Sequence, residues 1–176
     1  SPTSADEIVK YLGVPRSRLD IVPLAGDAPV AIDRSRAGAD GAMILAMGNR
    51  RPHKNWGALI RALPHIPEER RPRVVITGGR GEDPLQAVVD ELQMAPWVQL
   101  RGWVDDDDVR ELYSLATALA IPSLAEGFSL PTLEAMAAGV PVLLSDIEVH
   151  RFVGGDAAVY FDPRDDHSVA AALDSV

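Results

Sequence analysis

The chain has 176 residues, of which 47% are hydrophobic and 24% charged, a composition typical of one globular domain with a substantial core. The formal net charge of −9 at pH 7 disfavours nucleic acid as a partner, because binding to a phosphate backbone needs a basic face. The absence of cysteine excludes disulfides and thiolate metal sites, and no apolar run approaches the roughly eighteen residues that a transmembrane segment needs.

The first part of the chain differs from the rest. Residues 4–12 are expected to form a short helix, and residues 19–24 a short extended segment. Residues 25–41 are rich in Gly, Ala, Asp and Arg and are predicted to be a connecting loop. We therefore expect residues 1–41 to be a lead-in helix and linker from a missing amino-terminal domain, and residues 42–176 to be the main domain.

From residue 42 onward, apolar runs alternate with amphipathic stretches. Strands are expected at residues 42–47, 73–77, 97–101, 118–122, 140–144 and 157–161. Helices are expected at residues 55–63, 85–92 and 107–116, within 126–139, and from about 166 onward. Continuous apolar runs alternating with helices are typical of a parallel sheet that is covered on both faces. The pattern predicts an α/β fold with a Rossmann-like, doubly wound parallel sheet of about six strands.

The turn after the fourth predicted strand carries the clearest chemical signal. Residues 126–141 read Glu-Gly-Phe-Ser-Leu-Pro-Thr-Leu-Glu-Ala-Met-Ala-Ala-Gly-Val-Pro. Pro131 is expected in the first turn of a helix, and Ser129 as its N-cap, with Leu130 as the alternative. Backbone N–H groups at such a helix start are unpaired and can bind an anion. Glu134 would lie beside that anion, where a carboxylate is reasonable if it binds sugar hydroxyls attached to the anion.

A basic loop follows the first predicted strand. Residues 48–54 read Gly-Asn-Arg-Arg-Pro-His-Lys and place three fixed positive charges in an acidic chain. A solvated basic loop is the alternative interpretation. Ligands bind open parallel sheets at the carboxyl ends of the strands where the strand order reverses, which in the usual order lies between the first and fourth strands. We therefore expect the basic loop and the turn after the fourth strand to face each other.

The two loops together favour a diphosphate ligand. The backbone N–H groups of residues 128–130 would hold one phosphate, and Lys54 with Arg50 or Arg51 would hold the other. The carboxylates would then accept hydrogen bonds from sugar hydroxyls. Glu134 would bind those of the ribose, and Glu126 those of a second sugar. A glycosidase acid/base pair also uses two carboxylates, but the adjacent cationic loop argues against it.

These residues resemble the signature of the group 1 (family 4) glycosyltransferases of the GT-B fold. The central match is the turn from Glu126 to Glu134 and the helix that follows it. Other segments that agree are Gly48 with residues 52–55, residues 100–104 and residues 155–163. The resemblance covers about residues 4–176 and is to the carboxy-terminal, nucleotide-sugar-binding domain of that family, the second half of a GT-B enzyme.

The resemblance implies an activity. Such enzymes are retaining transferases that move a sugar from a nucleotide-diphosphate sugar, here a UDP- or GDP-sugar, to a glycan or lipid-linked acceptor in bacterial cell-surface polysaccharide synthesis. It implies no cofactor and no essential metal. It also implies that the acceptor binds to the missing amino-terminal domain, so this chain alone is expected to be inactive. The expected location is cytoplasmic, with the full-length protein at the inner membrane surface. The alternatives are a non-catalytic nucleotide-sugar-binding module and a nucleotide-sugar epimerase of GT-B architecture.

The resemblance also implies roles for individual residues. Glu126, Lys54 and Arg50 are expected to contact the reacting sugar and the leaving diphosphate. The residues expected to bind the rest of the donor are Gly48, Arg51, Trp103, Val104, Gly127, Phe128, Ser129, Leu130 and Glu134. Many members of the family have Arg directly after the glycine of the first strand, where this chain has Asn49 followed by two arginines. Either Arg50 or Arg51 could therefore meet the diphosphate.

Several other features have simpler interpretations. Residues 105–108 are all aspartate and are expected to cap a helix rather than bind a metal. Residues 78–81 lack the spacing of a dinucleotide fingerprint and are expected to be a turn that borders the base. The remaining expectations concern aromatic side chains: Trp56 and Trp97 in the core, and His65, His150 and His167 on the surface.

Overall fold

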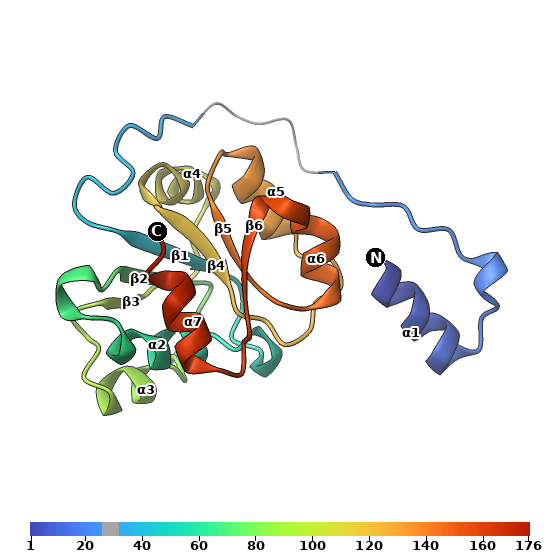
Figure 1. Ribbon diagram of the computed structural model, residues 1–176, viewed down its shortest axis with the longest axis horizontal. Helices are drawn as coiled ribbons and strands as arrows, with labels where there is room; N and C mark the ends of the chain where they lie inside the picture. Colours follow the sequence, from blue (N-terminus) through green and yellow to red (C-terminus); the bar gives the residue numbers. More distant parts are fainter. Residues whose placement is uncertain (26–31) are drawn as a thin grey trace.

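The computed structural model describes residues 1–25 and 32–176 and contains one parallel sheet with helices on both faces (Figure 1). The strands are β1 (Met43–Met47), β2 (Arg73–Thr77), β3 (Val98–Leu100), β4 (Ala118–Ile121), β5 (Val142–Ser145) and β6 (Ala158–Phe161). Their order is β3-β2-β1-β4-β5-β6, so the order reverses between β1 and β4. The predicted fold class, a Rossmann-like doubly wound sheet of six strands, is confirmed.

The centre of the sheet is apolar on both of its faces. Ile44 and Leu45 of β1 point to opposite faces, and both are fully buried. Leu45 is in register with Val75 of β2 on one side and with Leu119 of β4 on the other. Burying one such side chain contributes about 1.5–3 kcal/mol. This explains why the strands read as continuous apolar runs rather than as alternating ones.

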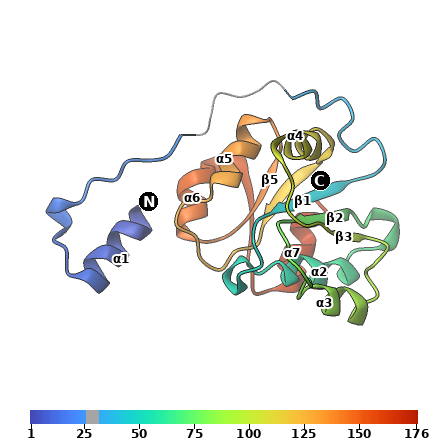
Figure 2. The same cartoon turned by 180° about the vertical axis from the view of Figure 1, so that it is seen from behind.

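The helices form two layers, which Figures 1 and 2 show from opposite sides. One layer holds α2 (Gly57–Ala62), α3 (Gln86–Glu91) and α7 (Asp166–Leu173), and the other holds α4 (Asp106–Leu115), α5 (Leu130–Ala137) and α6 (Glu148–Gly154). The sequence analysis missed α6. This helix has seven residues, and its N-cap, Ile147, makes no side-chain capping bond, so the usual start signal is absent. None of the helices in the described residues is long and apolar enough to cross a membrane.

The amino-terminal segment lies beside the sheet domain. The expected first helix is present as α1 (Pro2–Leu12), which ends at Gly13 in the left-handed conformation. It contacts α6, and its Ser4 hydroxyl donates to the carbonyl of Gly127 over 3.3 Å. Residues 19–24, expected as an extended segment, form no strand of the sheet. Part of the predicted loop over residues 25–41, namely 26–31, falls outside the described residues, and the division at residue 41 stays a prediction.

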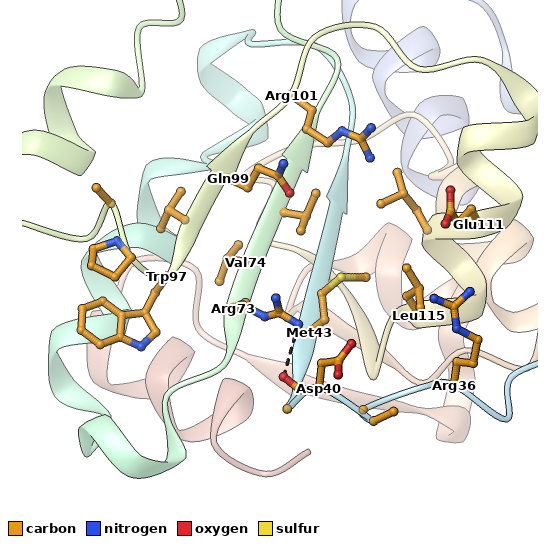
Figure 3. A pocket seen from close by; sticks show the side chains of 18 residues that line it. Arg36, Asp40, Met43, Arg73, Val74, Trp97, Gln99, Arg101, Glu111 and Leu115 are labelled. Atoms are coloured by element: carbon orange, nitrogen blue, oxygen red, sulfur yellow. Dashed lines mark hydrogen bonds between the residues drawn. The ribbon is translucent and has the colours of Figure 1, made fainter.

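One part of the sheet face carries polar side chains. Beyond α4, the face of β2 and β3 presents Arg73, Gln99 and Arg101 (Figure 3). Together with the turn before β1 they line a groove of about 530 Å³, in which Arg73 donates to the carbonyl of Asp40 over 3.3 Å. Polar residues on this face are consistent with an edge of the sheet that meets water. The groove lies away from the loops that the sequence analysis singled out.

Candidate functional site

The loops after β1 and β4 are in direct contact at the carboxyl edge of the sheet. The backbone N–H of Leu124 donates to the carbonyl of His53 over 2.7 Å, and the side-chain amide of Asn55 donates to the carbonyl of Pro122 over 3.1 Å. Asn55 adopts a left-handed conformation with φ 54°, which ends the short 3₁₀ helix at Pro52–Lys54. The expectation that the basic loop faces the turn after the fourth strand is confirmed.

Lys54 and Glu126 meet at this junction. The Lys54 ammonium lies 2.6 Å from Oε1 of Glu126, and the two side chains are only 16% and 9% exposed. The hydroxyl of Ser123 donates to the same carboxylate oxygen, also over 2.6 Å. Burying a carboxylate without partners is costly, and these two donors offset that cost. Ser123, two residues beyond the end of β4 at the carboxyl edge of the sheet, is a residue that sequence reasoning missed.

The start of α5 has the features of an anion site. Ser129 is the N-cap, as predicted, and Pro131 lies in the first turn. Ser129 has φ 80°, and its hydroxyl pairs with that of Thr132 at 2.8 Å instead of capping the backbone. Within the described residues, the backbone N–H groups of Phe128 and Ser129 have no protein acceptor. The helix start therefore keeps donors that a ligand can use.

Arg50 is placed differently from the expectation. Its guanidinium binds the carboxylate of Asp83, with the shortest contact at 2.7 Å. It also donates to the carbonyls of Thr77 (2.7 Å), Gly48 (3.2 Å) and Ile76 (3.2 Å), so its five N–H donors are occupied by the protein. Burial opposes ionisation of Asp83, but hydrogen bonds from Arg50 and from the backbone hold its pKa below the usual value.

Arg50 therefore ties the loop after β1 to β2, and its expected role at the diphosphate stays a prediction. The carboxylate that holds it comes from a loop that the sequence analysis did not use. Arg51, the alternative that the sequence left open, is exposed and lines the adjacent crevice.

A crevice of about 680 Å³ opens at the same edge, over the ends of β1 and β2. It is lined by Gly48, Arg50, Arg51, Thr77, Gly78, Arg80, Trp103, Val104, Asp106, Val109 and Pro131, among others. Five of the predicted donor-binding and catalytic residues thus share one cavity. Lys54, in the loop after β1, lies outside this lining, as do Glu126, residues 127–130 and Glu134 on the turn and helix around Pro131.

Gly78 permits the loops around this crevice to approach closely. It has φ 86°, and a Cβ there would lie 2.5 Å from the carbonyl oxygen of Gly48. Its N–H donates to the carbonyl of Gly102 over 2.8 Å. Gly78 and Arg80 of this segment line the crevice, and the expectation that the segment borders the base stays a prediction.

Glu134 lies near a buried tyrosine. Its Oε2 is 3.5 Å from the hydroxyl of Tyr113, which is on α4 and only 4% exposed. Burial, together with the nearby negative charge of Glu134, raises the pKa of Tyr113, so the phenol stays protonated and can act as a donor. The sequence analysis missed Tyr113, since nothing in its spacing relates α4 to α5.

His150 corrects another expectation, because it is fully buried rather than on the surface. Its Nδ1 lies 2.9 Å from the hydroxyl of Ser145 and 3.0 Å from the carbonyl oxygen of the same residue. Burial lowers the pKa of His150, partly offset by its bond to Ser145 and by the charge of Glu126. His65 and His167 are exposed as expected, and their rings contact each other at a tilt of 47°, with centroids 4.1 Å apart.

The remaining expectations concern the core and the acidic run. Trp56 is buried, and its indole N–H donates to the carbonyl of Asn49 over 2.7 Å. Trp97 packs partly buried against the core under Arg71, whose guanidinium carbon lies 4.5 Å from its ring centroid. Asp105 is the N-cap of α4, as predicted, and accepts from the N–H of Asp108 over 2.9 Å. Among the described residues, no cluster of acidic or histidine side chains is arranged to hold a metal ion.

Comparison with known proteins relates this chain to a characterised group. Residues 30–176 match the family Glycosyl transferases group 1. The O-antigen chain mannosyltransferase B of Escherichia coli is 32% identical over 186 residues, which cover 98% of this chain and 49% of that protein. The chain thus spans about half the length of this relative, and less of several others.

Two solved structures share the fold. Sucrose-phosphate synthase from Thermosynechococcus elongatus superposes with a TM-score of 0.81 at 22% identity, covering 99% of this chain and 47% of the enzyme. HepE from Anabaena, solved in complex with UDP, superposes with a TM-score of 0.66 at 17% identity, covering 99% of this chain and 43% of that protein. The sheet with its flanking helices is therefore one half of the GT-B architecture.

Proposed function

The chain belongs to the group 1 glycosyl transferases, and on this basis we propose that it binds the nucleotide-diphosphate sugar of a retaining glycosyltransferase. The observation that carries the proposal is the contact of Lys54 with Glu126, which joins the basic loop after β1 to the helix start after β4. Lys54, Glu126 and the unpaired N–H donors of residues 128 and 129 thus lie on two loops that contact each other at the carboxyl edge of the sheet. A diphosphate with a sugar attached has the matching chemistry.

The diphosphate would be held from two sides. The backbone N–H groups of residues 128–130 and the positive end of α5 face one phosphate. Lys54 and Arg51 supply the cations for the other. We assign Arg51 rather than Arg50 to this role because the donors of Arg50 are already used within the protein. Each charge-assisted hydrogen bond is worth about 1.5–3 kcal/mol, so several of them together can hold a diphosphate without a metal.

The rest of the donor would extend to both sides of the diphosphate. Trp103 and Val104 border the crevice over β1 and β2, which suits the base. Glu134 would accept hydrogen bonds from the ribose hydroxyls. Glu126 would accept them from the transferred sugar, with Gly127 allowing close approach of the backbone. The turn between the two carboxylates contains Phe128, Ser129 and Leu130, whose backbone N–H groups would bind the phosphate.

The chemical step follows from this placement. The bond from the anomeric carbon to the phosphate oxygen breaks, and its electron pair leaves with the diphosphate. The acceptor oxygen bonds to the anomeric carbon on the same face and gives its proton to the departing diphosphate. Lys54, Arg51 and the start of α5 stabilise the charge that develops on the leaving group, and such preorganised donors are a large source of rate enhancement. We propose that no metal or cofactor is required.

The relatives suggest the class of sugar and acceptor. Two of them are O-antigen chain mannosyltransferases, so the first sugar to test is a hexose, and among hexoses mannose. The complex of HepE with UDP supports a nucleoside diphosphate as ligand. We propose a UDP- or GDP-sugar as donor and a glycan or lipid-linked acceptor. Because the relatives are about twice as long as the segment they share with this chain, we propose that the acceptor binds to their additional part.

Titration calorimetry with UDP, GDP, UDP-glucose, GDP-mannose, ADP-glucose and TDP-glucose tests the proposal. At least one nucleotide sugar should bind, and Glu134→Ala should weaken that binding. A response to none of the six ligands would refute the donor-binding function.

A further inference from the structure

A buried chain of hydrogen bonds leads to Glu126 from behind the site. The hydroxyl of Ser123 donates to Glu126, and the carbonyl of Ser123 accepts from the hydroxyl of Ser145 over 2.6 Å. Ser145, at the end of β5, is in turn bound by His150 of α6 over 2.9 Å. Ser123, Ser145 and His150 are each fully buried. The chain thus crosses from α6 through the ends of β5 and β4 to the carboxylate.

Chemistry fixes the direction of each bond. Ser145 has one hydroxyl proton, and a carbonyl oxygen can only accept, so that proton is directed to Ser123. The hydroxyl oxygen of Ser145 is then the acceptor for Nδ1 of His150, as is the carbonyl oxygen of Ser145. His150 must therefore carry its proton on Nδ1. Its Nε2 is buried without a partner among the described residues, which is tolerable only while it carries no proton.

The same assignment leaves one oxygen of Glu126 for a ligand. Both protein donors, the ammonium of Lys54 and the hydroxyl of Ser123, bind Oε1. No described residue donates to Oε2, and this oxygen is not sealed from solvent. A carboxylate held at one oxygen by two donors from different loops has little freedom to rotate. Its second oxygen is then presented in a fixed direction.

We propose that Ser123 is a positioning residue that directs Oε2 of Glu126 toward a hydroxyl of the donor sugar, and that Ser145 and His150 hold Ser123 in place. The inference rests on the proposed function, since it requires Glu126 to contact the sugar. It adds three residues to the donor site, none of which touches the donor. If the three residues only joined β4 to β5, substituting them would lower stability and would weaken the binding of nucleoside diphosphates and nucleotide sugars to the same extent.

The test compares nucleoside diphosphates with nucleotide sugars on this chain. Calorimetry with GDP and GDP-mannose, and with UDP and UDP-glucose, is run on wild type and on Ser123→Ala, Ser145→Ala, His150→Leu and His150→Asn. Ser114→Ala is the matched control, because its hydroxyl bonds only to the carbonyl of Glu111 within its own helix. If Ser123→Ala does not fold, Ser123→Cys, which retains a weaker donor, replaces it.

We expect Ser123→Ala to raise the Kd for the nucleotide sugar about tenfold, the loss of one well-placed charge-assisted bond, and to leave the Kd for the nucleoside diphosphate within about twofold. Ser145→Ala and His150→Leu should act in the same direction, about threefold. His150→Asn should bind like wild type, since its amide N–H can reach the acceptors of Nδ1. Ser123→Ala should add nothing in a Glu126→Gln background.

The outcomes separate the two proposals. If Glu126→Gln weakens sugar-nucleotide binding and Ser123→Ala does not, the positioning role is wrong and the donor-binding function stands. Equal losses for nucleoside diphosphate and nucleotide sugar would show a merely structural role and overturn the inference as well. If wild type binds none of these four ligands and neither ADP-glucose nor TDP-glucose, the donor-binding function fails, and the positioning role fails with it.

Discussion

Lys54 and Glu126 form an ion pair of 2.6 Å that joins the loops after β1 and β4, where the strand order of the sheet reverses. Each residue therefore holds the other's loop in place. The Lys54 ammonium has three donors and uses one on Glu126, so it can keep this contact while it binds a phosphate. The pair also prevents Glu126, whose side chain is 9% exposed, from being a buried and uncompensated charge.

Removing Lys54 should affect both binding and stability. We expect Lys54→Ala to raise the Kd for a nucleoside diphosphate at least tenfold, because one charge-assisted bond is lost. The free energy of unfolding should fall by about 1–3 kcal/mol, because Glu126 loses its counter-ion. Lys10, the other lysine of the chain, is exposed on α1, and Lys10→Ala is the control. Calorimetry and urea unfolding measure the two effects, and unchanged ligand affinity in Lys54→Ala would contradict the assignment.

The two adjacent arginines should separate stability from binding. Arg50→Ala should lower the free energy of unfolding by about 2–3 kcal/mol, because Asp83 and three carbonyls lose their donor. Arg51→Ala should change stability by less than about 0.5 kcal/mol but raise the Kd for the nucleoside diphosphate about tenfold. Urea unfolding and calorimetry on both variants test this. A wild-type Kd for the nucleoside diphosphate in Arg51→Ala would contradict the assignment of Arg51 to the phosphate.

Glu134 should recognise ribose in particular. We expect Glu134→Ala to raise the Kd for UDP or GDP about tenfold, and to have no effect on the corresponding 2′,3′-dideoxynucleotides, which lack the hydroxyls. Tyr113→Phe should cause a smaller loss of the same kind, because the phenol lies 3.5 Å from the carboxylate. Competition binding with the two nucleotide types gives the comparison. Equal losses of affinity for the ribonucleotides and the dideoxynucleotides would show that Glu134 does not contact the ribose hydroxyls.

Gly78 should not tolerate a side chain. A Cβ at this position would lie 2.5 Å from the carbonyl oxygen of Gly48, and φ is 86°. We expect Gly78→Ala to destabilise the protein by more than about 2 kcal/mol and to disturb the crevice. Gly81→Ala is the matched control, because φ is 62° there and a Cβ would meet no atom within 4 Å, and it should cost about 1 kcal/mol. Thermal unfolding of both variants measures the difference, which should vanish if only backbone strain matters.

His150 should make stability depend on pH. Its pKa in the folded protein is below the ordinary value of 6.5, so the unfolded chain takes up a proton first as the pH falls. The free energy of unfolding should therefore decrease from about pH 6.5 downward until the folded-state pKa is reached. His150→Asn cannot take up this proton and should lose that part of the slope. Urea unfolding between pH 5 and 8 measures it, and identical slopes in the two proteins would argue against a buried neutral imidazole.

Much of the architecture could be predicted because it is encoded locally. Six apolar runs alternating with amphipathic stretches specify strands and helices through their periods, and right-handed crossovers leave few ways to assemble them. The turn at residues 126–131 likewise contains its own N-cap and first-turn proline. Among the α-helices of the described residues, α6 was missed because it is short and has no side-chain cap. The usual order of strands in such a sheet then predicts that the basic loop faces the turn.

The sequence alone thus determined the fold class, which two loops meet at the carboxyl edge of the sheet, and the residue types that these loops carry. The tertiary structure decided which of them are free to act. Arg50 and Arg51 are equivalent in sequence. In the structure, Arg50 is bound by the carboxylate of Asp83, which is 33 residues away in the chain. The sequence predicts His150 on the surface, but α6 places it in the interior, in contact with Ser145. Such pairings join different elements, and periodicity within one element carries no information about which side chains two elements will bring together.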